Sequence, residues 1–137
     1  MPMRGRKIAF DYGDTRIGVA VCDPDGILAS PLPFIHNGAA RNRELIELLD
    51  EYDPNEIIVG LPLTLSGGAG QAIAKVEEFC KDLAKLSDLP IIKIDERLST
   101  VGAAKALRDA GKSAKESRTL VDSMAAVAIL ESYLATR

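Results

Sequence analysis

Four carboxylates stand where predicted strands end or where a predicted helix begins, and they suit a divalent metal ion. They are Asp11, Asp95, Glu96 and Asp122. Mg²⁺ prefers oxygen ligands and keeps several waters, so two or three carboxylates and a substrate phosphate can complete its shell. Two such ions about 4 Å apart can activate a water and stabilise the leaving oxygen of a phosphodiester. These acids therefore indicate metal-assisted hydrolysis, with Mg²⁺ or Mn²⁺ as the expected ion.

The acids at strand ends depend on how the strands are ordered. Asp11 ends the apolar run Ile8–Phe10, whereas Asp95 and Glu96 follow the apolar run Ile91–Ile94. The carboxyl ends of parallel strands share one edge of a sheet, and ligands of open α/β sheets bind there. Side chains alternate along a strand, so at most one of Asp95 and Glu96 faces the site, and the pattern does not decide which. For Asp11, the simpler alternative is a hydrogen bond within its own turn.

Asp122 lies in a run that is otherwise free of charge. It is the only charged residue between Thr119 and Leu130. Apolar residues surround it on nearly every side of the predicted helix, so we expect it to be partly buried near the first turn. A buried carboxylate without a partner is unfavourable, and a metal ion or the helix dipole would offset that cost. A dipole-stabilising acid without a metal is the alternative.

Hydrophobic periodicity and turn residues predict the elements that position these acids. Strands are predicted at Ile8–Phe10, Ile17–Val21, Ile27–Leu32, Glu56–Gly60 and Ile91–Ile94. Helices are predicted at Asn42–Tyr52, across Ile73–Leu86, from Ser99 or Thr100 to about Ala110, and from about Thr119 to Leu134. Gly13 is expected to allow a tight hairpin between the first two strands. Pro31, Pro33 and the Asn37-Gly38 pair are expected to mark a loop.

This order of elements predicts a single α/β domain over residues 1–137. Its five-stranded mixed sheet has three antiparallel N-terminal strands, then parallel strands, with helices on both faces. No apolar run approaches the ~18 residues that a membrane span needs. Cys22 and Cys80 lack metal-ligand spacing, so we expect reduced core cysteines in a cytoplasmic protein. The single histidine, His36, argues against a histidine-based triad or zinc site.

The net charge of −3 is not typical of a nucleic-acid-binding protein, so such binding would require a local basic surface. Two basic clusters could supply one, although basic clusters are more often ordinary solvated surface. The first comprises Arg4, Arg6 and Lys7; the second comprises Lys105, Arg108, Lys112, Lys115 and Arg118. We favour the second for phosphate contacts, in a basic loop over residues 112–118 that precedes the last helix.

Four sequence blocks resemble the YqgF/RuvX family in order and spacing, and the resemblance covers essentially the whole chain. The blocks are Phe10–Gly13 with Arg16–Ala20, Ile58–Leu63, Asp95–Thr100, and Val121–Ala126 with Ile129–Leu130. The Asp-Glu-Arg-Leu-Ser-Thr and Gly-Leu-Pro-Leu segments together are specific. One departure is the loop Thr64–Gly67, where many members have Asn-Met-Asp-Gly.

The resemblance implies an RNase H-like fold related to the RuvC resolvases. It implies that Asp11, Glu96 and Asp122 are the catalytic, metal-binding acids, and so selects Glu96 over Asp95. It implies an endonuclease that matures the 5′ end of pre-16S ribosomal RNA, or alternatively a Holliday junction resolvase acting on four-way DNA. We favour structured precursor RNA on the basis of the family, because nothing in these residues distinguishes base or sugar.

Five basic residues are expected to bind substrate phosphates: Arg16, Arg97, Lys112, Lys115 and Arg118. Arg16 and Arg97 stand next to acidic positions, and Arg97 could equally be a structural ion-pair partner. The oligomeric state stays open between monomer and homodimer. A resolvase needs two symmetric cuts, whereas an RNA enzyme that makes one cut could act alone. Ribosomal precursor particles are a plausible partner, since an acidic protein has modest affinity for nucleic acid by itself.

Two other classes of protein fit less well. ATP-handling proteins of the actin, Hsp70 and sugar-kinase type begin with a similar Asp-x-Gly hairpin, but they need two such domains around the nucleotide. This chain has the length of one. A non-catalytic nucleic-acid-binding module that keeps the fold is the other class, and the presence of all three acids argues against it.

Overall fold

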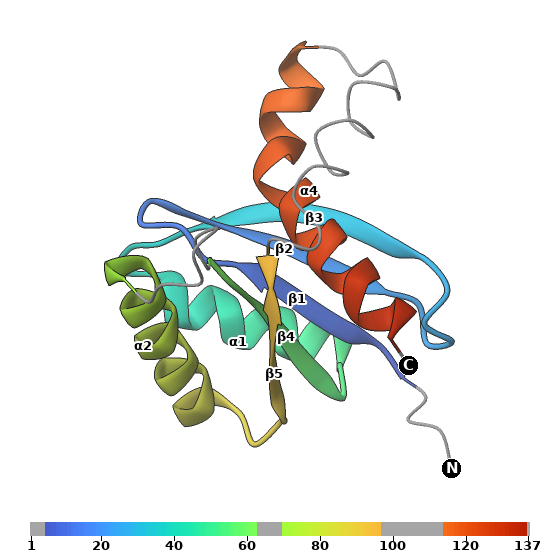
Figure 1. The fold of residues 1–137 in the computed structure, drawn as a ribbon, viewed down its shortest axis with the longest axis horizontal. Helices are drawn as coiled ribbons and strands as arrows, with labels where there is room; N and C mark the ends of the chain where they lie inside the picture. Colours follow the sequence, from blue (N-terminus) through green and yellow to red (C-terminus); the bar gives the residue numbers. More distant parts are fainter. Residues whose placement is uncertain (1–4, 63–69, 97–113, 137) are drawn as a thin grey trace.

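A five-stranded mixed sheet forms the centre of the computed structural model (Figure 1). The structure describes residues 5–62, 70–96 and 114–136, with the side chains of the last helix described from residue 123 onward. The strands are β1 (Lys7–Asp11), β2 (Arg16–Cys22), β3 (Ala29–His36), β4 (Glu56–Leu61) and β5 (Ile91–Asp95). The helices are α1 (Arg41–Tyr52), α2 (Gln71–Leu86) and α4 (Ala114–Ala135). The helix predicted from Ser99 or Thr100 to about Ala110 lies outside the described residues.

The strand order in the sheet is β3-β2-β1-β4-β5. β1 pairs antiparallel with β2, and β2 pairs antiparallel with β3, so the predicted N-terminal meander is confirmed. β4 lies parallel to β1 on one side and to β5 on the other. The carboxyl ends of β1, β4 and β5 therefore share one edge, as predicted for the acids that follow them.

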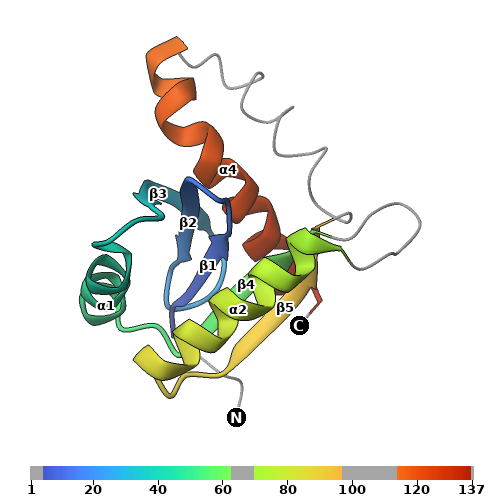
Figure 2. The same cartoon turned by 90° about the vertical axis from the view of Figure 1, so that its left-hand side faces the viewer.

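Helices cover both faces of the sheet (Figure 2). On one face, Phe10 of β1 packs edge-on against Phe79 of α2, with 6.0 Å between ring centroids. On the other face, Ala9 of β1 belongs to a core cluster with Ala126 and Leu130 of α4. Successive side chains of β1 therefore pack alternately into two hydrophobic cores, one on each face of the sheet. Of the described helices, none has both the length and the apolar character needed to cross a membrane.

The third strand begins later than the predicted Ile27–Leu32. A carboxylate oxygen of Asp23 accepts hydrogen bonds from the amides of Ile27 (2.7 Å) and Leu28 (3.0 Å), which keeps both residues in the turn. The Leu28 amide is the main cause that lowers the pKa of the Asp23 carboxyl. Ile27 is 80% exposed, so it adds nothing to the core. The prediction that the strand starts at Ile27 is therefore wrong, because a local side-chain contact competes with the sheet.

The same strand also runs further than predicted, through Pro31 and Pro33 to His36. Proline lacks the N–H that a strand donates, so it is tolerated mainly at the edge of a sheet. β3 is an edge strand. The prediction of a loop at these prolines is wrong for that reason.

The last helix begins at Ala114 rather than at about Thr119. The segment Ala114–Arg118 contains Ala, Lys, Glu and Arg, which favour helix, and it lacks Gly and Pro. The predicted basic loop over residues 112–118 is therefore wrong from residue 114 onward. The N-terminal half of α4 extends past the sheet in both views (Figures 1 and 2).

The two cysteines are buried free thiols. The Sγ atom of Cys22 accepts a hydrogen bond of 3.2 Å from the backbone amide of Lys7. Burial is the main cause that raises the pKa of the Cys80 thiol, which keeps it protonated at neutral pH. Both residues behave as core side chains, as predicted.

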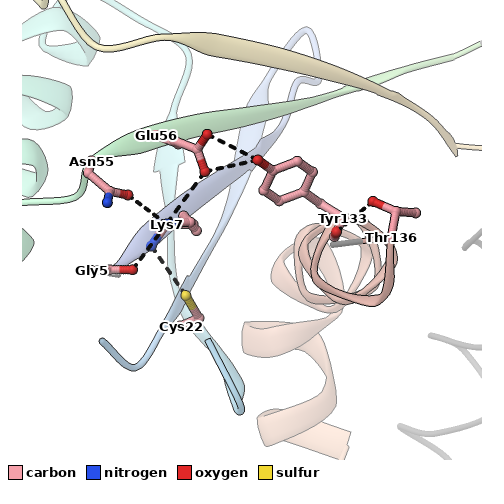
Figure 3. A network of polar contacts seen from close by, with 7 residues as sticks. All are labelled: Gly5, Lys7, Cys22, Asn55, Glu56, Tyr133 and Thr136. Carbon is pink, nitrogen blue, oxygen red and sulfur yellow. Dashed lines mark hydrogen bonds and ion pairs between the residues drawn. The ribbon is translucent and has the colours of Figure 1, made fainter. Parts of the chain in front are cut away.

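A buried polar cluster joins the amino-terminal ends of β1 and β4 to α4 (Figure 3). The Lys7 side chain is 0% exposed; its Nζ donates to Asn55 Oδ1 at 2.8 Å and lies 3.4 Å from Glu56 Oε1. The Tyr133 hydroxyl lies 2.9 and 3.0 Å from the two carboxylate oxygens of Glu56. The expectation that Lys7 belongs to a basic surface is therefore wrong. Side chains alternate along β1, so the Lys7 side chain is on the same face as Ala9, which α4 covers.

This cluster gives a prediction for stability. We expect Lys7→Met to lower the free energy of unfolding by about 3 kcal/mol, because it leaves the Glu56 carboxylate buried without its cation. Lys81→Met is the matched control: Lys81 is 72% exposed, so we expect a change below about 0.5 kcal/mol. Urea denaturation at pH 7 measures both variants. Equal losses would show that the cluster does not stabilise the fold.

Candidate active site

The sheet register brings the ends of three strands together. Phe10 of β1 pairs with Val59 of β4, so Asp11 lies beside Gly60, one residue further along each strand. Gly60 in turn pairs with Ile94 of β5. Neighbouring strands are about 4.8 Å apart, so β1 and β5 are roughly 10 Å apart at this edge. Gly60, which has no side chain, occupies the strand between them.

Alternation along the strands places Asp11 and Glu96 on the same face of the sheet. Ala9 packs on the α4 side, and Asp11 follows it by two residues. Ile94 packs on that side too, and Glu96 follows it by two residues. Asp95 has the opposite parity. The structure therefore selects Glu96 over Asp95 as the acid that shares a face with Asp11.

The Glu96 side chain crosses directly over Gly60. A Cβ atom built on Gly60 would lie 2.7 Å from Glu96 Cγ and 3.0 Å from Glu96 Cδ. It would also lie 2.5 Å from Cδ1 of Ile129, which comes from α4. Glycine is therefore required here by close approach. Its absent side chain is what lets the Glu96 carboxyl lie between β4 and α4.

Asp122 occupies the α4 position one turn before Ala126 and two turns before Ile129. Helical spacing puts these three positions on one side of the helix, and both later residues are buried against the sheet. Asp122 also lies about two turns inside α4, since the helix begins at Ala114. The expectation that it lies in the first turn is therefore wrong. Stabilisation by the helix dipole, which fades beyond that turn, no longer explains it.

The donors at this edge suit a hard divalent cation. Asp11 and Glu96 offer carboxylate oxygens on one face, and the missing side chain of Gly60 leaves space between their strands. Within the part of the chain whose side chains are described, no three His, Cys, Asp or Glu residues group closely enough to hold a metal. That part does not include the side chain of Asp122, so the three-acid site stays a prediction.

Arg16 begins β2, directly after the turn that follows Asp11 at the end of β1. A Cβ on Gly13 would lie 2.5 Å from the carbonyl oxygen of Arg16, so this turn needs glycine for close approach. The Arg16 guanidinium carbon lies 4.9 Å from the centre of the Phe34 ring, and that ring meets His36 edge-on at 5.2 Å. Arg16 is thus an exposed cation held on an aromatic ring.

For the other predicted substrate-binding residues, the structure describes the backbone alone or nothing. Lys115 and Arg118 lie on the N-terminal half of α4, which extends past the sheet. Arg97 and Lys112 lie outside the described residues. A cavity of about 350 Å³ also opens beside the β1–β2 turn, between Tyr12 and Lys75. Lys75 forms an ion pair of 3.1 Å with Asp14 at this cavity.

The sheet order, the helices on both faces and the position of Asp11 and Glu96 define an RNase H-like α/β protein. The model of a family described as "RuvX: Holliday junction resolvase" matches residues 5–136. The chain belongs to this family, and the resemblance to YqgF/RuvX is thereby confirmed.

Similar sequences carry a name that points to RNA. A relative from Streptomyces coelicolor is 48% identical over 134 residues, covering 96% of this chain and 80% of the relative. One from Rhodococcus jostii is 45% identical over 143 residues, covering 99% of this chain and 80% of the relative. Both are named "Putative pre-16S rRNA nuclease".

Similar solved structures are resolvases. RuvC from Thermus thermophilus, in complex with a Holliday junction substrate, has a TM-score of 0.56 at 14% identity, covering 96% of this chain and 95% of that one. A fowlpox virus resolvase bound to Holliday junction DNA has a TM-score of 0.58 at 15% identity, covering 96% and 97%. At these identities the similarity supports the RNase H-like fold alone.

Two residues that shape this site are not predicted as site residues from the sequence. Gly60 carries a signal in retrospect, because a glycine that ends a buried apolar strand often marks close approach by another group. Ser123 is a buried hydroxyl that hydrogen-bonds to the sheet; the apolar run around it indicates burial, but its hydrogen-bond partners on β2 and β3 leave no signal in the sequence.

Gly60 gives a second prediction. We expect Gly60→Ala to displace Glu96 and Ile129, to weaken Mn²⁺ binding at least about tenfold, and to lower the free energy of unfolding by about 1–3 kcal/mol. Gly38→Ala is the control, because a Cβ there meets nothing within 4 Å. Calorimetric Mn²⁺ titration and urea denaturation measure both. Wild-type Mn²⁺ affinity in Gly60→Ala would contradict the placement of Glu96.

Proposed function

We propose that this protein is a divalent-metal-dependent endonuclease that acts as a single domain in the cytoplasm. Asp11, Glu96 and Asp122 hold one or two Mg²⁺ or Mn²⁺ ions. The observation that carries the proposal is the Glu96 carboxyl lying over Gly60, on the face and at the edge where Asp11 ends β1. The metal, when bound, activates water for attack on a backbone phosphate and stabilises the leaving oxygen.

The protein's own residues position these ions and the substrate. β1 ends in Asp11 and β5 leads directly into Glu96, so rigid strands support both acids, and Asp122 belongs to α4, the helix that packs on the same face of the sheet. A rigid strand fixes a ligand more tightly than a loop does, which favours a defined coordination geometry. Arg16 contacts a substrate phosphate in this proposal, which its exposed guanidinium over the Phe34 ring supports.

We favour precursor ribosomal RNA as the substrate, with cleavage in 5′-end maturation of pre-16S RNA. The names of relatives at 45–48% identity over nearly the whole chain support this choice. Four-way DNA is the alternative, supported by the description of the family and by the resolvases that share the fold. The proposal includes precursor ribosomal particles as the form in which the RNA is presented. The oligomeric state follows the substrate: one cut in RNA needs only a monomer, whereas paired cuts in a junction need a homodimer.

Substitution of the acids tests the chemistry. We expect Asp11→Asn and Glu96→Gln to reduce Mn²⁺-dependent cleavage more than about a hundredfold, because each removes a charged metal ligand. Asp14→Asn and Asp95→Asn are the matched controls: each neutralises a neighbouring acid that the site does not use, and each should cleave like the wild type. A labelled pre-16S RNA and a synthetic four-way DNA junction serve as substrates in one assay.

The two substrates separate the two functions. Cleavage of the RNA alone, lost in Asp11→Asn, supports the processing nuclease. Paired symmetric cuts in the junction support a resolvase, which needs two active sites and therefore a homodimer. Equal cleavage by Asp11→Asn and the wild type would overturn the metal site.

The basic residues give a prediction about salt. With Lys112, Lys115 and Arg118 all changed to Gln, we expect weaker RNA binding and a dependence of log K on log salt that is shallower by about 2–3, since each phosphate contact contributes about 0.7–0.9. Lys81→Gln with Lys85→Gln on α2 is the control and should leave the slope unchanged. Filter binding across a salt series measures both. An unchanged slope in the triple variant would place the substrate elsewhere.

A further inference from the structure

Ser123 of α4 is a fully buried hydroxyl that joins two strands. Its Oγ accepts a hydrogen bond from the backbone amide of Val19 on β2 at 3.2 Å, and its hydroxyl donates to the backbone carbonyl of Leu32 on β3. Val19 and Leu32 are partners in the β2–β3 register. The serine hydroxyl therefore bridges the backbone amide of one strand and the backbone carbonyl of its partner strand.

The insertion lies at an irregularity in the sheet. The β2–β3 register shifts between Ile17 and Val19, where β3 has one residue more than β2. A bulge of this kind disrupts the local ladder and leaves backbone groups that need another partner. Ser123 supplies that partner from the helix. Its contact is specific to one place on the sheet, because the bulge occurs at one place.

Small side chains form part of the rest of the α4–sheet interface, beside the larger Ile58, Ile129 and Leu130. Its core includes Ala9, Ala20 and Ala29 on the strands and Ala126 on the helix. Small side chains allow close approach, but they form shallow ridges and grooves, so they fix the rotation and axial position of a helix poorly. A directional hydrogen bond to the bulge supplies the alignment that these alanines do not.

Ser123 is also the residue directly after Asp122. The N-terminal half of α4 extends past the sheet (Figure 2). Ser123 itself is fully buried against the sheet. The hydrogen bonds of Ser123 therefore hold the α4 backbone at the residue next to Asp122.

We propose that Ser123 is a positioning residue for the metal site: its two hydrogen bonds to the β2–β3 bulge fix the turn of α4 that carries Asp122 relative to the strands that carry Asp11 and Glu96. This inference rests on the proposed function, because it assumes that Asp122 is a metal ligand. Groups that orient metal ligands without touching the ion typically change metal affinity 10–100-fold when removed.

The structure provides a matched control at the far end of the same helix. Tyr133 ties α4 to Glu56 through its hydroxyl, close to the amino-terminal edge of the sheet and away from Asp122. Tyr133→Phe and Ser123→Ala each remove one hydroxyl that joins α4 to the sheet. A role in stability alone predicts the same effect on the metal site from both variants.

The test is Mn²⁺ binding to the full chain, measured by electron paramagnetic resonance of the free ion, with thermal unfolding in parallel. We expect Ser123→Ala to raise the Kd for Mn²⁺ at least about tenfold, and Tyr133→Phe to leave it within about twofold of the wild type. Both variants should unfold at lower temperatures. Asp122→Asn in the same series shows whether the measured ion uses the proposed site.

Two further variants keep the test decisive if Ser123→Ala does not fold. Ser123→Cys keeps nearly the same volume but is a weak hydrogen-bonding group, so it should weaken Mn²⁺ binding. Ser123→Thr keeps the hydroxyl and adds a methyl group to a full site, so it should lose stability while retaining affinity. Metal affinity that follows the hydroxyl, and not the unfolding temperature, supports the positioning role.

The failures are distinguishable. Wild-type Mn²⁺ affinity in Ser123→Ala or Ser123→Cys, with binding abolished in Asp122→Asn, overturns the positioning role and leaves the metal site intact. Equal weakening by Ser123→Ala and Tyr133→Phe also overturns it, in favour of general loosening of α4. Unchanged binding in Asp122→Asn overturns the proposed metal site, and the role of Ser123 with it.

Discussion

The close packing of α4 on one face of the sheet is the constraint on which the site depends. Ala9, Ala20 and Ala126 keep this interface thin. At the carboxyl edge, Gly60 again has no side chain to separate the helix from the sheet. The side chains of Glu96 and Ile129 both lie in the space that a Cβ on Gly60 would occupy. A larger side chain in this layer would separate helix and sheet, and it would also move an acid on α4 away from the acids on the strands. Core packing and site geometry are therefore one requirement in this fold.

The central strands could be predicted because their composition leaves little choice. Buried parallel strands need continuous apolar runs, and Ile57–Val59 is such a run. Boundaries were predicted less well where a local interaction competes with the regular element. The Asp23 carboxylate removes two residues from the start of β3. The helix-favouring residues before Thr119 extend α4, although we predicted a loop there because the segment is rich in charge.

Some features of the candidate site could also be predicted from the sequence, whereas others depend on the fold. Acids at strand ends are visible in the sequence, but choosing Glu96 over Asp95 requires either the family or the side-chain parity of β5 in the folded sheet. The same limit applies to Lys7, which stands beside Arg6 in the sequence and looks like surface charge. Its partner Glu56 lies on another strand, and Tyr133 lies on the last helix. Contacts between residues so far apart in the sequence produce no local sequence pattern.

Carboxylates lie at both edges of the sheet. At the amino-terminal edge, the fold itself neutralises the buried Glu56 carboxylate with Lys7 and a tyrosine hydroxyl. At the carboxyl edge, it places Asp11 and Glu96 on one face across a glycine. Carboxylates gathered there repel a phosphodiester as well as one another, and the protein as a whole carries a charge of −3. A divalent cation removes both repulsions at once. Metal dependence and nucleic-acid binding are thus a single electrostatic requirement of the proposed site, which explains why an acidic chain can act on a polyanion.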